Sequence, residues 1–390
     1  MKKKIIILGS TGSIGKNALS ILNYEKNFKI ELLSTNRNAN KLLSQAKKFN
    51  VKNVIISDKN IFFKYKNKFK KNNINLYLGF GNLKKIIKKK VNYCINSISG
   101  IDGLDPTLKI IPLTRNILIA NKESIICGWH IIKEKLKKYN TNFIPIDSEH
   151  FSIWQLIKND NFDIIDKVIL TASGGPFYGK TFKKIYNTPP YKALNHPKWK
   201  MGKKISIDSS TMMNKIFEFI EAKNLFNLKN NNIQILIHPK SFVHAIIFFK
   251  NNLIKFLAHE TNMKIPIKSA MNIYNKKISK SIVSKNLKNF NSLIFNLPMK
   301  KNYPLLKILD LIPEKSSYFE TILITINDTL VDKYLKYEIN YKSLQLNLLN
   351  LLKKPYFTKY YKLKPNNIYD IIKMTKITKS YLEINLKKYD

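Results

Sequence analysis

Arginine is nearly absent from this chain, although the chain carries a large excess of positive charge. The 390 residues include 69 lysines and arginines against 25 acidic residues, a net charge of +44, yet Arg37 and Arg115 are the only arginines. Specific nucleic-acid recognition favours the planar arginine fork, and the lysines are spread along the whole chain instead of forming one stripe. We therefore expect no specific nucleic-acid partner, and non-specific attraction to polyanions only as a by-product.

Cysteine and long apolar runs are also scarce. The two cysteines, Cys94 and Cys127, lie inside apolar segments, which excludes a disulfide framework and a cysteine metal site. No stretch is long and apolar enough to span a membrane, and the apolar run after the N-terminal lysines is too short for a secretion signal. The hydrophobic share of 44% is typical of a folded globular protein. We expect a cytoplasmic protein without a membrane partner.

Glycine is rare, and its placement is informative. The chain has 12 glycines, none after Gly202, and three of them fall within seven residues, at Gly9, Gly12 and Gly15. They follow the apolar run Ile5–Leu8 and precede a segment with helical spacing. A strand, glycine turn and helix form a cradle for a dinucleotide pyrophosphate. The spacing is G-x-x-G-x-x-G instead of the commoner G-x-G-x-x-G, and a tight turn without a ligand is the alternative.

Residues 1–146 alternate between short apolar runs and helical patterns. Six runs are predicted strands: Lys4–Leu8, Phe28–Ser34, Asn53–Ile56, Tyr93–Asn96, Asn116–Ala120 and Asn142–Pro145. Several of them lack alternation, as buried parallel strands do. The sequence therefore predicts an α/β fold with a Rossmann-like, doubly wound domain at residues 1–146.

Beyond this domain the pattern changes twice. Residues 147–275 hold most polar motifs and three further predicted strands, Lys167–Thr171, Ile233–Ile237 and Ala245–Phe249, and are expected to form an α+β catalytic domain. Residues 276–300 are expected to be a linker. Residues 301–390 contain no glycine and repeat apolar residues at helical spacing, which predicts a C-terminal helical bundle.

The end of the second predicted strand indicates the cofactor. NAD sites usually place an acidic residue there for the ribose hydroxyls, but here Glu31 lies mid-strand and the strand runs into Asn36, Arg37 and Asn38. A basic and polar tip suits the 2′-phosphate of NADP. An ordinary solvated arginine is the alternative reading of Arg37.

Two carboxylates follow the last strand of the first domain. Asp147 and Glu149 are two residues apart, so on an extended segment both point the same way. Such a pair suits a hard divalent cation such as Mg²⁺ or Mn²⁺, although the D-x-E pattern is also common on surfaces.

A second carboxylate source lies in the predicted helix after residue 210. Asn214, Lys215 and Glu218 share one face of this helix, which suits a phosphorylated ligand beside a metal. An amphipathic surface helix with one ion pair is the alternative. The expected helix cap is one of three residues, Asp208, Ser209 or Ser210.

Two loops complete this predicted site. Ser173 opens a Ser-Gly-Gly-Pro turn after a strand, a plausible phosphate nest. Trp199 and Met201 lie in a segment rich in lysine and proline, which favours a lid that closes over a substrate. A loop aromatic packed on the surface is the alternative for Trp199.

Together these segments closely resemble one enzyme family. GSTGSIG at 9–15, ANKES at 120–124, DSEH at 147–150, SGGPF at 173–177, HPKWKMG at 196–202 and SIDSSTMMNK at 206–215 occur in order. They resemble the 1-deoxy-D-xylulose 5-phosphate reductoisomerases, and the resemblance covers the whole chain. It implies conversion of that sugar phosphate to 2-C-methyl-D-erythritol 4-phosphate with NADPH and a divalent metal, either Mn²⁺ or Mg²⁺ with Co²⁺ as a third option. It also implies a homodimer, with the dimer interface in residues 147–275.

The resemblance implies roles for individual residues. The implied metal ligands are Asp147, Glu149 and Glu218, which together with Lys122 are the implied catalytic residues. The implied substrate-binding residues are Lys122, Ser148, Glu149, Ser173, His196, Trp199, Ser209, Asn214, Lys215 and Glu218. The implied cofactor-binding residues are Gly9, Ser10, Thr11, Gly12, Ser13, Ile14, Gly15, Asn36, Arg37, Asn38, Asn121, Glu123 and Gly202. Glu221 is expected behind the metal site, and His150, His238 and His244 are expected to be packed or to support ligands rather than to bind metal.

Two departures from the family pattern affect these expectations. Thr261-Asn262-Met263-Lys264 stands where the family commonly has Pro-Asp-Met-Arg, which bears on lid rigidity, and Asn36 replaces a usual glycine near the 2′-phosphate. Two rival functions are a sugar-phosphate dehydrogenase without isomerisation and a polyanion-binding protein with a degenerate nucleotide domain. The three implied metal carboxylates argue against both.

Overall fold

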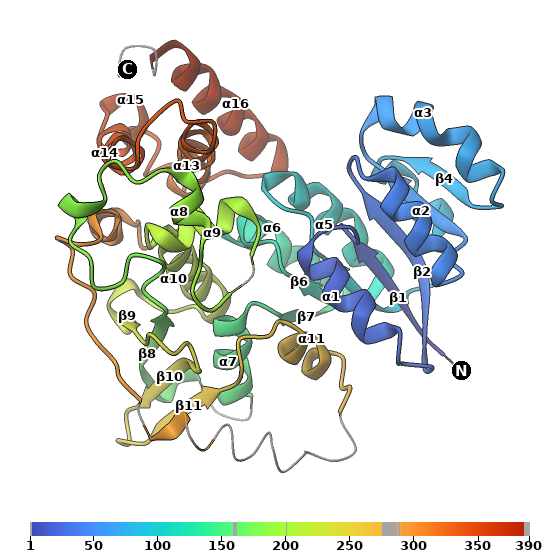
Figure 1. Cartoon of the computed structure of the whole chain (residues 1–390). Coiled ribbons are helices and arrows are strands. Elements are labelled where there is room, and N and C mark those ends of the chain that lie inside the picture. Colours follow the sequence, from blue (N-terminus) through green and yellow to red (C-terminus); the bar gives the residue numbers. More distant parts are fainter. Residues whose placement is uncertain are drawn as a thin grey trace. The chain divides into compact units, whose positions relative to one another are not determined.

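The computed structural model describes residues 2–158, 162–199, 201–274, 287, 289–291 and 293–385 (Figure 1). The chain divides into two compact units. The first comprises Met1–Ser124, Gly128–Asp147 and Met263–Tyr274. The second comprises Ile125–Cys127, Ser148–Asn262 and Asn275–Asp390.

The first unit is built on a seven-stranded parallel sheet with the order β4-β3-β2-β1-β5-β6-β7. Its strands are β1 Lys3–Leu8, β2 Phe28–Thr35, β3 Asn53–Ile56, β4 Asn75–Leu78, β5 Val91–Asn96, β6 Thr114–Ile119 and β7 Asn142–Pro145. Its helices are α1 Ser13–Leu22, α2 Ala39–Lys48, α3 Lys59–Lys70, α4 Leu83–Ile86, α5 Leu104–Ile110, α6 Lys122–Tyr139 and α11 Lys264–Ala270. Since β1 lies between β2 and β5, the strand order reverses at β1, where doubly wound folds bind their ligands.

The first strand shows why the sheet is parallel and buried. Ile5, Ile6, Ile7 and Leu8 are all 0% exposed, so both faces of β1 are covered. Four consecutive buried residues leave no solvent face, as is usual in a sheet with helices on both sides.

The second unit contains a four-stranded sheet and most of the remaining helices. The sheet has the order β11-β10-β8-β9, in which β8 pairs parallel with β9 while β10 runs antiparallel to β8 and β11. Its strands are β8 Ile165–Ala172, β9 Ile233–Ile237, β10 Val243–Phe249 and β11 Ile254–Ala258. The helices are α7 Ser148–Leu156, α8 Pro190–Leu194, α9 Lys203–Ser210, α10 Met213–Phe226, α13 Phe319–Leu335, α14 Tyr341–Leu352, α15 Pro355–Thr358 and α16 Ile368–Asn385. Helix α13 packs against both α14 and α16 in the orange and red part of Figure 1.

Short 3₁₀ helices join these elements. They are η1 Phe80–Asn82, η2 Ile101–Gly103, η3 Ile111–Leu113, η4 Phe162–Ile164, η5 Phe182–Ile185, η6 Asn230–Asn232 and η7 Pro304–Leu311. Among the described residues, no helix has both the length and the apolar character needed to cross a membrane.

The α/β architecture with a C-terminal helical region agrees with the prediction from sequence. All nine predicted strands are present, and Asn53–Ile56, Asn142–Pro145 and Ile233–Ile237 have the predicted bounds. Sequence reasoning missed β4 and β11. Both are edge strands with no fully buried residue, so they lack the continuous apolar run that marks the others.

The domain boundaries remain predictions. The segment Met263–Tyr274 clusters with the first unit, where Ile267, Ala270 and Met271 join its core, although the predicted catalytic domain extends to residue 275. Of the predicted linker at 276–300, residues 276–286, 288 and 292 lie outside the described residues.

Asparagine occupies most left-handed backbone positions that glycine does not. Nine described residues other than glycine have positive φ, and six of them are Asn50, Asn73, Asn140, Asn227, Asn252 and Asn272. Asn140 ends α6 and Asn227 ends α10 as the C-cap in the left-handed conformation. Asparagine tolerates this conformation better than other residues with a side chain.

Candidate functional site

The turn after β1 requires glycine for steric reasons. Gly9 has φ +77°, and a Cβ atom there would lie 2.7 Å from the carbonyl oxygen of Ser97. A Cβ atom on Gly15 would lie 2.5 Å from the carbonyl oxygen of Gly9. Gly12, the N-cap of α1, has no side chain to accept from the first amide groups of this helix. The turn therefore leaves helix N–H groups for another acceptor, as a pyrophosphate cradle does.

The polar residues of this turn anchor it to neighbouring elements. The Ser10 hydroxyl donates to Oε1 of Gln45 at 2.7 Å, and the hydroxyls of Thr11 and Thr35 are 2.7 Å apart. Ser13 and Ile14 are the first two residues of α1. Seven predicted cofactor positions between residues 9 and 38 are not glycine. Ser13 and Ile14 lie in α1, and the other five lie just after the carboxyl ends of β1 and β2.

The tip of β2 carries an ion pair that sequence reasoning missed. Nε of Arg37 lies 2.9 Å from Oδ2 of Asp58, which directly follows Ser57 after β3. The other Asp58 oxygen accepts the Ile61 amide and caps α3; this bond, together with Arg37, lowers the pKa of Asp58. The Arg37 side chain is still 77% exposed. The acidic residue just after the neighbouring predicted strand, Asn53–Ile56, was the sequence signal that could have indicated this partner.

Asn36 and Asn38 shape the same tip. Oδ1 of Asn36 accepts the Ser57 hydroxyl at 3.1 Å, and Oδ1 of Asn38 accepts the Lys41 amide and caps α2. The three residues predicted to face the 2′-phosphate therefore have an ordered local structure. The side chain of Asn36, which stands where the family commonly has glycine, therefore has a hydrogen-bond partner at this tip.

The start of α6 holds three predicted site residues. Asn121 caps α6 by accepting the Ser124 amide at 2.6 Å, and its Nδ2 donates to the Gly100 carbonyl at 2.6 Å and to Glu123 at 3.3 Å. Lys122, the first residue of α6, places its Nζ 2.5 Å from Oδ2 of Asp147.

Three carboxylates come together around the start of α7. Asp147 is the residue before α7, Glu149 is in its first turn and Glu218 is on α10. One oxygen of each lies within 4.8 Å of the others, a spacing that permits one metal ion. The prediction that Asp147 and Glu149 share an extended segment is wrong, because Ser148 already begins a helix. The carboxylates are brought together by the helix start and by α10 instead.

Lys215 lies among these carboxylates. Its Nζ is 2.9 Å from Oε1 of Glu149 and also pairs with Glu218, while Nδ2 of Asn214 donates to Oε1 of Glu218 at 2.6 Å. Burial would lower the pKa of Lys215, but the two carboxylates outweigh it and raise this pKa above its ordinary value. Ser148 donates its hydroxyl to Glu149. Oxygen donors of this kind fit a hard cation such as Mg²⁺ or Mn²⁺.

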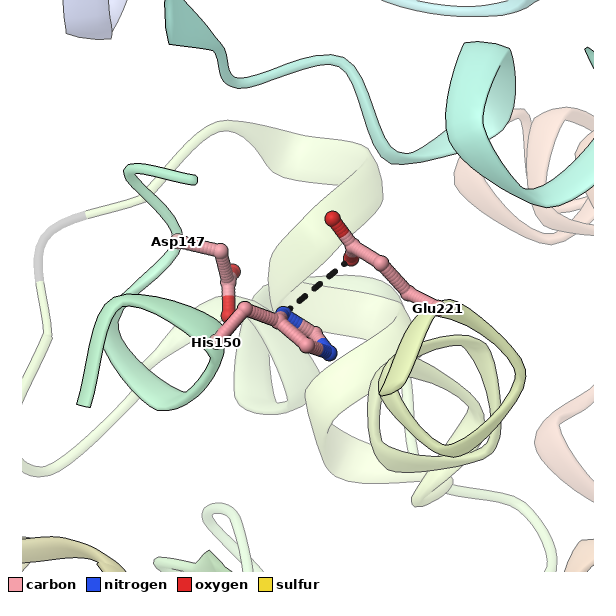
Figure 2. A group of neighbouring side chains, drawn as sticks. All are labelled: Asp147, His150 and Glu221. Atoms are coloured by element: carbon pink, nitrogen blue, oxygen red, sulfur yellow. Dashed lines mark ion pairs between the residues drawn. The ribbon is translucent and has the colours of Figure 1, made fainter. Parts of the chain in front are cut away.

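A histidine lies beside Asp147 and forms an ion pair with Glu221, as Figure 2 shows. His150 on α7 places Nδ1 3.4 Å from Oε2 of Glu221, and its Nε2 is 2.9 Å from the backbone oxygen of Glu218. Asp147, His150 and Glu221 also have ligand atoms within 4.8 Å of one another. Because the His150 ring is hydrogen-bonded to the backbone of Glu218, it links α7 to α10.

The Ser173 hydroxyl is oriented by two donors. His196 accepts the Trp199 amide at Nδ1, 2.9 Å away, so the neutral ring carries its proton on Nε2 and donates it to Ser173 Oγ at 2.9 Å. The Gly175 amide donates to the same oxygen at 3.1 Å. Burial lowers the pKa of His196 to about 4, so the ring is neutral at pH 7. With two bonds accepted, Ser173 retains its own proton for a ligand acceptor.

The Ser-Gly-Gly-Pro turn lies directly against α9. Gly175 has φ +68°, and a Cβ atom there would lie 2.9 Å from the carbonyl oxygen of Ser209. The structure thus brings the segments of Ser173 and Ser209 together. The predicted helix cap is wrong: Asp208, Ser209 and Ser210 lie inside α9, and Met212, with φ +65°, separates α9 from α10 without a side-chain cap.

The predicted lid segment already has one anchor. The Trp199 ring is half-buried and meets the His244 ring edge to face with centroids 6.2 Å apart. His244 in turn stacks on His259 at 3.8 Å. Nδ1 of His238 donates to the Ile294 carbonyl oxygen at 2.9 Å, and the ring stacks on Phe295. Gly202 is exposed and is the N-cap of α9.

Comparison with known proteins identifies the family. The model for 1-deoxy-D-xylulose 5-phosphate reductoisomerase matches residues 5–128, the model for its C-terminal domain matches residues 143–226, and a second model, the DXP reductoisomerase C-terminal domain, matches residues 259–381. The enzyme of that name from Pelagibacter ubique is 48% identical over 375 residues, 95% of this chain and 96% of its own. That from Wolbachia pipientis wMel is 39% identical over 349 residues, 87% of each chain.

Solved structures agree with this result. A crystal structure of DOX-P reductoisomerase in complex with NADPH, fosmidomycin and magnesium has a TM-score of 0.89 at 30% identity and covers 99% of this chain and 98% of its own. The Zymomonas mobilis enzyme in complex with NADPH has a TM-score of 0.85 at 25% identity, with 97% of each chain covered. The chain described here belongs to the 1-deoxy-D-xylulose 5-phosphate reductoisomerase family.

Proposed function

We propose that this protein converts 1-deoxy-D-xylulose 5-phosphate to 2-C-methyl-D-erythritol 4-phosphate, an isomerisation followed by reduction, with NADPH and a divalent metal. The convergence of Asp147, Glu149 and Glu218 on one point carries the proposal, because a simple dehydrogenase needs no such site. Family membership and relatives solved with NADPH and magnesium support it.

The three carboxylates would hold the cation. Mn²⁺, Mg²⁺ and Co²⁺ all fit their oxygen donors. When bound, the cation supplies Lewis-acid stabilisation of negative charge that develops on the substrate oxygens. Lys122, paired with Asp147 at 2.5 Å, and Ser148 would contact the sugar hydroxyls beside it.

The phosphate would be held by Ser173, Ser209, Asn214 and Lys215. Ser173 has its acceptor sites filled by His196 and Gly175, which leaves a donor for a phosphate oxygen. A metal ion bound to the carboxylates would neutralise the negative charge of Glu149 and Glu218 that Lys215 now balances. The Lys215 ammonium would then be available to the phosphate. Binding energy from a phosphate remote from the reacting carbons helps to hold the reactive geometry. His196 and Trp199 would complete the enclosure.

NADPH would bind the first unit. The glycine turn from Gly9 to Gly15 would cradle the pyrophosphate, and Asn36, Arg37 and Asn38 would contact the 2′-phosphate. The ion pair with Asp58 holds Arg37 at this tip, which supports a preference for NADPH. We assign Asn121, Glu123 and Gly202 to the binding of the same cofactor.

We further propose a homodimer in the cytoplasm, with residues 1–146, 147–275 and 301–390 as functional divisions. The edge strand β11 supports the dimer, because Ile254 and Phe256 are 56% and 46% exposed next to the exposed Leu253. Native proteins seldom leave apolar edge strands uncovered. Cys94 and Cys127 are both buried and form no disulfide, which fits a reducing compartment.

One assay tests the reaction. NADPH oxidation is followed after addition of 1-deoxy-D-xylulose 5-phosphate with Mn²⁺ or Mg²⁺, and the product mass is measured. Turnover should require the metal, and Asp147→Asn, Glu149→Gln and Glu218→Gln should each reduce kcat by at least about 100-fold while far-UV circular dichroism is unchanged. Near-normal rates in all three variants would refute the metal site. Reduction without a change of carbon skeleton would favour the simple dehydrogenase.

A further inference from the structure

The C-terminal third of the chain reaches the predicted phosphate site through tyrosine hydroxyls. Four tyrosines there donate to backbone carbonyls: Tyr303 to Gly174 at 2.9 Å, Tyr334 to Thr188 at 2.7 Å, Tyr341 to Ser210 at 2.8 Å and Tyr361 to Leu352 at 2.7 Å. Two of these acceptors directly follow predicted phosphate ligands. Gly174 follows Ser173, and Ser210 follows Ser209.

Tyr303 holds the glycine turn. Gly174 and Gly175 both have positive φ, so this turn has little conformational restraint of its own. Tyr303 is 6% exposed, and burial raises its pKa to about 12. The hydroxyl therefore keeps its proton and remains a donor to the Gly174 carbonyl across the working pH range.

Tyr341, at the start of α14, contacts both phosphate segments. Its hydroxyl lies 2.8 Å from the Ser210 carbonyl and 3.2 Å from Ser210 Oγ, and its ring meets Phe177 of the glycine turn edge to face at 5.2 Å. Ser210 is the last residue of α9, so its carbonyl has no partner further along that helix. Tyr341 is 0% exposed, and it satisfies this carbonyl.

Asn327 on α13 adds a third contact. Its Nδ2 donates to Oδ1 of Asp208 at 2.8 Å, and both side chains are buried, at 1% and 3% exposure. Asp208 precedes Ser209 on α9. A buried amide that donates to a buried carboxylate fixes the rotation of α9 about its axis, and with it the direction of the Ser209 side chain.

We propose that Tyr303, Tyr341 and Asn327 are positioning residues for the substrate phosphate, an inference that rests on the proposed function. They hold the segments of Ser173 and Ser209 in register where these segments touch at Gly175. The C-terminal helical region then takes part in substrate binding without touching the substrate. A small slip between the two segments would separate the hydroxyls that the phosphate must bridge.

Four matched substitutions test this proposal. Tyr303→Phe and Tyr341→Phe remove the two hydroxyls that hold the phosphate segments, whereas Tyr334→Phe and Tyr361→Phe remove equivalent hydroxyls elsewhere. We expect the first pair to raise KM for 1-deoxy-D-xylulose 5-phosphate and the inhibition constant of inorganic phosphate about fivefold each. The KM for NADPH and kcat should change less than twofold. The second pair should lose similar thermal stability with both phosphate constants unchanged.

A charge swap separates positioning from stability. Asp208→Asn and Asn327→Asp should each raise KM for the sugar phosphate, and the double variant should recover most of the loss because it restores a donor and an acceptor in opposite order. Equal KM changes in all four tyrosine variants, or none in the first pair, would overturn the inference. Ser209→Ala tests the phosphate site separately from the positioning role. If Ser209→Ala raises KM for the sugar phosphate while Tyr341→Phe does not, the phosphate site stands and only the positioning role is refuted. An unchanged KM in Ser209→Ala would refute the phosphate site and the inference with it.

Discussion

Nζ of Lys215 lies 2.9 Å from Oε1 of Glu149, and this buried ion pair ties α10 to α7 inside the predicted metal site. Glu218 shares the same ammonium group. A divalent cation would neutralise the same two carboxylates. Lys215 and the metal therefore compete for the same negative charge.

Lys215→Met should reveal this competition. Without metal, two buried carboxylates lose their counter-charge, and we expect a loss of about 3–5 kcal/mol in the free energy of unfolding. Added Mn²⁺ should then raise the Tm more in this variant than in the unmodified protein, because the ion replaces the missing cation. Thermal unfolding with and without MnCl₂ measures both effects.

Lys223→Met is the matched control, since Lys223 is a buried lysine on the same helix that faces Glu320 instead. It should lose stability without a larger response to Mn²⁺. Equal Mn²⁺ shifts in the two variants would show that Lys215 does not share its partners with the metal.

Arg37→Ala should reduce the preference for NADPH over NADH. Charge-assisted hydrogen bonds to a phosphate contribute about 1.5–3 kcal/mol, so the ratio of the two kcat/KM values should fall roughly tenfold or more. Asp58→Asn should reduce this ratio less. The variant removes the ion pair of Arg37 but keeps Arg37 itself and an acceptor that caps α3. Arg115→Ala, at the other arginine of the chain, should leave the ratio unchanged. Equal use of both cofactors by the unmodified protein contradicts this prediction.

Trp199→Ala should slow turnover more than it destabilises the free protein. The ring is half-buried against His244 and would bury more of its surface on closure, roughly 150–250 Å² in total. We expect a lower kcat/KM with little change in Tm. Indole fluorescence should respond to substrate, and this response should shrink in the variant, with Trp129 and Trp154 as background. A large loss of ligand-free stability would show instead that Trp199 is structural.

Glu320 should make stability depend on pH. Burial raises its pKa from 4.5 to about 7, against the opposing effect of Lys223. Between these values the folded state holds a proton that the unfolded chain releases, so the free energy of unfolding should fall as pH rises from 4.5 to 7, by on the order of 3 kcal/mol. Glu320→Gln should flatten this slope in urea titrations at pH 5 and pH 8. Glu314→Gln, at an exposed neighbour, should retain it; a retained slope in Glu320→Gln would assign it to another group.

The sequence predicted those features that depend on local pattern. Buried parallel strands such as Asn53–Ile56 are continuous apolar runs, and glycine turns such as that at Gly9 have few alternatives. Long-range partners were not predictable, because nothing near Ser210 or Gly174 in sequence indicates a hydroxyl from Tyr341 or Tyr303. Edge strand β11 also lacked a signal, since its side chains are largely exposed.

The site residues were found from short motifs, but their surroundings were not. A D-x-E pattern gave Asp147 and Glu149 without showing that α7 begins between them. Serines before a helix gave the expectation of a cap, whereas tertiary packing extended α9 through them. Local propensity is a weak guide where a segment is held by contacts from distant helices.

The left-handed asparagines have a consequence for the unfolded chain. A glycine at Asn140 or Asn227 would adopt the same helix-ending conformation with no steric cost, but it would also give the unfolded chain more freedom to lose. Asparagine adds a small strain to the native backbone, but it leaves the unfolded chain with less conformational entropy than glycine does. Replacing glycine in this way at helix ends makes folding less costly in entropy, so a chain with 12 glycines in 390 residues need not be a less stable one.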